Sequence, residues 1–135
     1  MADITITAAN VQQSTASIDT RGTAAEAINA GQCVYVNSSG LIALADASAS
    51  ATAAVVGVAI NTAAAGQKVS YSTKDSLFTI GGTVVARESY VVSATAGGIA
   101  PASDLLTGEY ISSIGVAIST TEIYLNPYAT GANPA

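Results

Sequence analysis

The stretch AGQCVYVNSSGLIALAD, residues 30–46, decides the fold class of this chain. The apolar run Cys33 to Val36 is followed by Asn-Ser-Ser-Gly and then by the apolar run Leu41 to Leu44. A loop of this kind that ends in glycine suits a β-hairpin, because glycine readily adopts the positive φ that tight turns need. The stretch therefore predicts two antiparallel strands joined by a short turn.

The same order of features returns in ARESYVVSATAGGIAPASD, residues 86–104. After a linker, each stretch is followed by Gly-Val-Ala-Ile, at 57–60 and again at 115–118. We interpret the pattern as an internal duplication with copies at residues 30–71 and 86–125. A hairpin pattern shared without duplication would also explain the match, because it is short and the second copy lacks the turn at 63–66.

Glycines and an alanine-rich stretch predict further bends, turns and loops between and within the copies. Gly57 and Gly115 each precede Val-Ala-Ile, where a missing Cβ would let a strand bend or another backbone approach closely. Leu77 to Ile80, Gly81-Gly82 and Thr83 to Ala86 predict one more hairpin. The segment Ala45 to Ala54 has no large apolar stripe and is expected to be a loop with at most one helical turn.

Composition supports an all-β fold with little helix. Half of the residues are hydrophobic, but they are mostly Ala, Val and Ile, and only 10% are charged. Small and β-branched residues mixed with Ser, Thr and Gly favour short strands and tight turns.

The duplicated pattern sits inside a β-rich domain at residues 25–126, flanked by two different ends. Residues 1–24 are expected to form an N-terminal arm that serves attachment rather than folding, because they hold too little apolar area to offset the cost of ordering. Residues 127–135 form a C-terminal tail with too many breakers to extend a strand. The candidate contacts with a partner or another subunit are the apolar residues of the arm and a tyrosine of the tail: Ile4, Ile6, Val11, Ile18 and Tyr128.

The residue inventory argues against catalysis, metal binding and nucleic-acid binding. The chain has no histidine, and its single cysteine, Cys33, is interpreted as a buried, inert residue in an apolar run. Four basic residues against nine acids cannot form a nucleic-acid patch, and no segment resembles a signal peptide or a transmembrane span. We therefore expect no enzyme activity, no cofactor, no metal and no membrane contact. The rival interpretation, a small ligand-binding barrel or enzyme, would depend on Asp104, Glu109 and Tyr110.

Three short motifs resemble the capsid decoration, or cement, proteins of tailed phages. They are AGQCVYV at residues 30–36, VGVAI at 56–60 and AAAGQKV at 63–69, and the resemblance extends over about residues 30–126. The arm at residues 1–24 and the second Gly-Val-Ala-Ile depart from the family pattern.

The resemblance implies a small antiparallel β-barrel or β-tulip domain that forms a homotrimer. It implies a structural protein of the virion, made in the host cytoplasm, that binds the outer surface of the assembled capsid and bridges subunits of the major capsid protein. A fibre or adhesin module that contacts a host surface remains the alternative, since composition does not separate the two.

Overall fold

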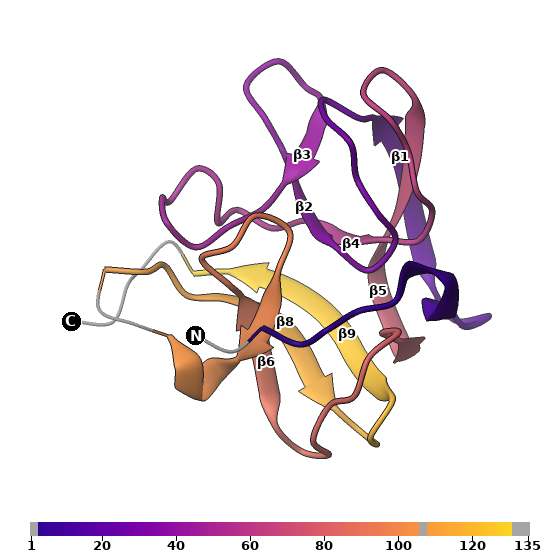
Figure 1. Cartoon of the computed structure of the whole chain (residues 1–135), viewed down its shortest axis with the longest axis vertical. Coiled ribbons are helices and arrows are strands. Elements are labelled where there is room, and N and C mark those ends of the chain that lie inside the picture. Colours follow the sequence, from indigo (N-terminus) through magenta and orange to yellow (C-terminus); the bar gives the residue numbers. More distant parts are fainter. Residues whose placement is uncertain (1–2, 106–107, 131–135) are drawn as a thin grey trace.

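The computed structural model describes residues 3–105 and 108–130, which form one antiparallel β-sheet that curls into a half-barrel (Figure 1). Its strands are β1 (Ile18–Thr23), β2 (Cys33–Val36), β3 (Ile42–Leu44), β4 (Gly57–Ala59), β5 (Lys68–Thr79), β6 (Ser89–Val92), β7 (Ile99–Pro101), β8 (Ser112–Ala117) and β9 (Glu122–Ala129). The helical segments of the described residues are two single 3₁₀ turns, η1 (Ala8–Asn10) and η2 (Ala102–Asp104). The expected all-β, barrel-like fold is confirmed.

The two halves of the sheet connect their strands in the same way, counted from the edge strand of each half toward the centre. The strands lie in the order β3-β2-β4-β5-β9-β8-β6-β7, and β1 pairs with β5 off this path. The first half, β3-β2-β4-β5, thus has the same connectivity as the second half, β7-β6-β8-β9. The two halves correspond to the predicted copies and meet at the pairing of β5 with β9 (Figure 1).

The register of the ladders aligns the two copies residue by residue. Cys33 pairs with Val58 and Val58 with Ser72, just as Ser89 pairs with Val116 and Val116 with Tyr124. The two glycines of the Gly-Val-Ala-Ile motifs are equivalent too, since Gly57 pairs with Val34 and Gly115 with Tyr90.

Both glycines allow the close backbone approach expected from the sequence. A Cβ at Gly57 would lie 2.5 Å from the carbonyl oxygen of Ser72, and one at Gly115 only 2.0 Å from that of Tyr124.

The two hairpins predicted inside the copies form, and the third does not. Gly40 and Gly97 adopt φ values of 78° and 77° in the β2–β3 and β6–β7 turns. The predicted hairpin at residues 77–86 was wrong, because the chain after Gly81-Gly82 does not return along β5. Instead, the N–H groups of Ile80 and Val84 donate to Thr121 and Thr120 in the β8–β9 turn, and Val84 enters the core.

The segment at residues 45–54 is a loop that contains one helical hydrogen bond, from the N–H of Ala53 to the carbonyl of Ala49. This agrees with the sequence-based expectation.

The N-terminal segment is part of the fold rather than a free arm. The N–H of Ile4 donates to the carbonyl of Ile99 (2.9 Å), Gln12 bridges to Thr79, and β1 pairs along the first half of β5. The apolar area of this segment does not reveal its polar anchors, in which Ser14 binds the buried carboxylate of Asp75.

The C-terminal end also differs from the expectation, because β9 continues as a strand through Asn126 to Ala129. Pro127 is tolerated at this point since it falls in an irregularity of the β8–β9 register, between the pairs Gly115–Leu125 and Ser113–Tyr128. The rest of the predicted tail, residues 131–135, lies outside the described residues.

Two clusters of buried side chains form the core. The larger one joins residues of both copies, including Cys33, Val58, Tyr90 and Ile123. The smaller one belongs to the first copy and includes Val34 and Tyr71, covered by Ile28 from the segment before β2. The first copy is therefore covered on both faces.

Candidate binding surface

Three of the predicted contact residues pack on their own chain. Ile4, Ile6 and Val11 are partly buried against the larger core cluster. Ile6 and Val11 meet over Gly31, where a Cβ would lie 2.4 Å and 2.9 Å from their methyl groups. In this structure these side chains hold the N-terminal segment in place and are only partly accessible to a partner.

The other two predicted contact residues are exposed. Ile18 at the start of β1 is 57% exposed, and Tyr128 near the end of β9 is 66% exposed. They lie on different strands, and β5 pairs with both of those strands. Each is available to a partner without any movement of the chain.

A row of exposed side chains that the sequence analysis missed crosses the second copy. Ser89, Val116 and Tyr124 are paired neighbours on β6, β8 and β9, and Val116 and Tyr124 are 42% and 41% exposed. Leu77, 46% exposed, continues the row on β5, because Ser76 and Leu77 lie opposite Tyr124 in the β5–β9 irregularity. We call Ser89, Val116, Tyr124 and Leu77 the open row.

The equivalent row in the first copy is completely buried. Cys33, Val58 and Ser72 are each 0% exposed, and we call them the covered row. The N–H of Cys33 donates to the carbonyl of Gly97 (3.2 Å) in the second copy, and the hydroxyls of Ser17 and Ser72 lie 2.7 Å apart. The second copy and the N-terminal segment thus cover this row. Sequence alone could not show the difference, since both rows belong to similar motifs.

Cys33 has the chemistry of a core residue rather than of a nucleophile. Burial raises the pKa of its thiol to about 12, and the nearby carboxylates of Asp3 and Asp46 act in the same direction. Its Sγ lies 3.3 Å from the carbonyl oxygen of Gly98, to which the thiol donates. Because thiolates are the reactive form, this cysteine is inert at neutral pH, as the sequence analysis expected.

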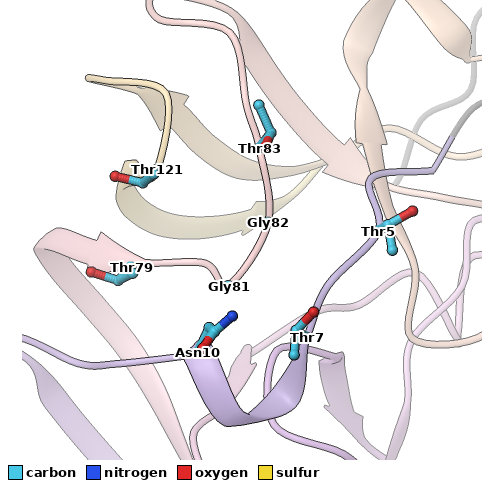
Figure 2. Close-up of a pocket in the computed structure, with 8 residues that line it drawn as sticks. All are labelled: Thr5, Thr7, Asn10, Thr79, Gly81, Gly82, Thr83 and Thr121. Atoms are coloured by element: carbon cyan, nitrogen blue, oxygen red, sulfur yellow. The ribbon is translucent and has the colours of Figure 1, made fainter.

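The largest of three described clefts is shallow and lined by hydroxyl groups. It measures about 460 Å³ and lies where the N-terminal segment meets the Gly81-Gly82 turn (Figure 2). Its polar side chains are five threonines and one asparagine: Thr5, Thr7, Thr79, Thr83, Thr121 and Asn10. No charged or aromatic residue lines it, so it offers neither acid–base chemistry nor a stacking surface for a sugar.

The residues of the rival enzyme interpretation do not line any of the three clefts. Glu109 is buried and Asp104 belongs to η2, and neither they nor Tyr110 contribute to a described cleft. Within residues 3–105 and 108–130, no three of the Cys, Asp and Glu side chains come together as a set that could hold a metal ion.

Among the described residues there is no helix with the length and apolar character needed to cross a membrane.

No protein-family model matches this sequence, and no curated protein is significantly similar to it.

Proposed function

We propose that the protein is a structural component of a phage virion that binds the outer surface of the assembled capsid and stabilises it. The observation that carries the proposal is the distribution of exposed apolar side chains. Large apolar residues at least 41% exposed lie on several strands and loops: Ile18, Val36, Leu77, Val85, Val116, Ile118, Tyr124 and Tyr128. A large partner can bind such a surface through many small contacts, and two of its residues are tyrosines, a type that is enriched at protein interfaces.

The motifs that resemble cement proteins form the centre of the first copy. Residues 30–36 lead into and form β2, the Gly-Val-Ala of the second motif is β4, and residues 63–69 turn into β5. The resemblance therefore concerns a packed structural unit, and an attachment role needs no active site. Copies tied together in an oligomer make their later contacts with the lattice intramolecular, and avidity can then exceed the affinity of a single site by about 10² to 10⁴.

Ile18 and Tyr128 are the residues that we assign to capsid contact. More than half of each side chain is exposed, at 57% for Ile18 and 66% for Tyr128. Tyrosine suits this role because it contributes a large, rigid contact area and keeps a polar end that can stay hydrated.

Co-sedimentation tests the proposal. The full chain is mixed with expanded, DNA-free heads of the phage that encodes it, and the bound fraction is measured. We expect saturable binding over the whole head, weakened about tenfold or more by Tyr128→Ala or Ile18→Ala. Ser38→Ala, at an exposed residue of the β2–β3 turn that does not belong to this apolar set, is the control. Protein that stays in the supernatant contradicts the proposal, and labelling of the tail alone would favour a fibre.

A further inference from the structure

We propose that the open row is the surface through which one copy of this chain binds a second copy. The inference holds whether or not the protein decorates a capsid, since it concerns contacts between identical chains. It starts from the contrast between two equivalent rows, of which one is 0% exposed and the other carries side chains 41% to 46% exposed.

Residues of the second copy bury most of the covered row. Cys33 and Val58 belong to the same core cluster as Ala117 and Ile123 of the second copy. The N–H and the thiol of Cys33 both donate to the β6–β7 turn, at Gly97 and Gly98. Cys33 and Val58 are therefore buried by another unit of the same fold, while the N-terminal segment covers Ser72. The chain itself thus contains an example of one unit packing on another.

The open row carries apolar side chains where polar ones are expected. An antiparallel sheet that faces water on one side normally turns polar residues outward. Here Leu77, Tyr124 and Val116 point outward on three adjacent strands, β5, β9 and β8. Where the covered row has Ser72, the open row has Tyr124, a residue type that is enriched at protein interfaces.

The open row is uncharged, although the chain as a whole is acidic. The chain carries a formal charge of −5, but none of the four residues of the open row is charged. When two such rows meet, the row residues themselves place no like charges opposite each other, which limits the repulsion that opposes self-association of an acidic protein. A second copy satisfies this condition automatically. Glu122, two residues before Tyr124 on the outward side of β9, lies beside the row.

Sedimentation equilibrium of the full chain over a range of concentrations tests the inference. We expect the wild type to sediment as a multiple of the chain mass and Val116→Lys to weaken association at least tenfold. The lysine lowers the net negative charge, so dissociation could not be ascribed to general repulsion. Tyr124→Ser, which installs the residue of the covered row, should give a smaller loss. Val36→Lys, at a similarly exposed valine (45% against 42%) of the first copy, should change nothing.

A wild type that is monomeric at every concentration would overturn the inference, as would unchanged association of a Val116→Lys variant that melts like the wild type. Should the lysine variant not fold, Val116→Cys and Val36→Cys replace it, because Cys33 is buried and leaves the new thiol as the reactive one. A short bismaleimide should link two chains through Val116→Cys and not through Val36→Cys. Equal or absent linking at both positions counts against the open row.

Discussion

Ser14 binds the fully buried carboxylate of Asp75 twice, through its backbone N–H (2.8 Å) and through its hydroxyl. The N–H of Leu77 donates to the same carboxylate (3.0 Å), so the charge is compensated by three donors. A buried carboxylate is costly unless it is well hydrogen-bonded, which makes this contact an anchor for the polar segment around it.

Ser14→Ala should therefore lower the free energy of unfolding by about 1 to 2 kcal/mol, because one charged partner loses a donor. Thermal unfolding followed by circular dichroism measures the change, expected to be a fall of several degrees. Ser48→Ala is the matched control, since Ser48 binds Asp46 through the same two groups at an exposed site. Equal effects of the two substitutions would show that burial of Asp75 contributes nothing.

The two hairpins inside the copies could be predicted from sequence because their signals are local. Gly40 and Gly97 sit where a tight turn needs positive φ, and apolar runs flank them. The position of the N-terminal segment could not be predicted, because Ser14 and Ser17 bind residues of β5 that lie 61 and 55 positions away in the sequence. The exposure of the open row could not be predicted either. Val58 and Val116 occupy the same place in the motif, and only packing between the copies distinguishes them.

Alanine at either of the equivalent glycines should be strongly destabilising. The added Cβ would meet a backbone oxygen at 2.5 Å for Gly57→Ala and at 2.0 Å for Gly115→Ala. Backbone cannot yield as a flexible side chain can, so we expect losses of about 3 kcal/mol or more, the upper range for overpacking. Gly40→Ala, whose Cβ would meet nothing within 4 Å, should cost about 1 kcal/mol through its positive φ alone. Chemical denaturation of the three variants would refute the close approach if all lost the same amount.

Alkaline pH should destabilise the protein through Cys33. Burial raises the pKa of the thiol from 9.0 to about 12, so between these values the unfolded chain has lost a proton that the folded chain keeps. The unfolded state then binds fewer protons, and the free energy of unfolding falls by about 1.4 kcal/mol per pH unit. Burial raises the pKa of Tyr71 as well, which acts in the same direction above its ordinary value.

Urea unfolding at a series of pH values from 8 to 11 measures this dependence. Cys33→Ala should be less stable than the wild type at pH 8 because it leaves a small cavity, but its stability should fall less steeply as the pH rises. Parallel curves for the two proteins would show that the thiol does not ionise on unfolding in this range.

Removing residues 2–17 should destabilise the fold, because these residues complete it. Their loss would leave Asp75 without the two donors of Ser14 and would remove Ile6 and Val11 from the core. Each partly buried aliphatic side chain contributes on the order of 1 to 2 kcal/mol, so the melting temperature should fall by more than about 10 °C. Ile6→Ser should reproduce part of the fall, whereas Ile18→Ser, at a 57% exposed position, should be nearly neutral. If the shortened chain melts within a few degrees of the wild type, the segment serves attachment alone and its contacts with β5 are not stabilising. Binding to heads, measured well below the melting temperatures of the wild type and of the shortened chain, would then separate a defect in attachment from a defect in folding.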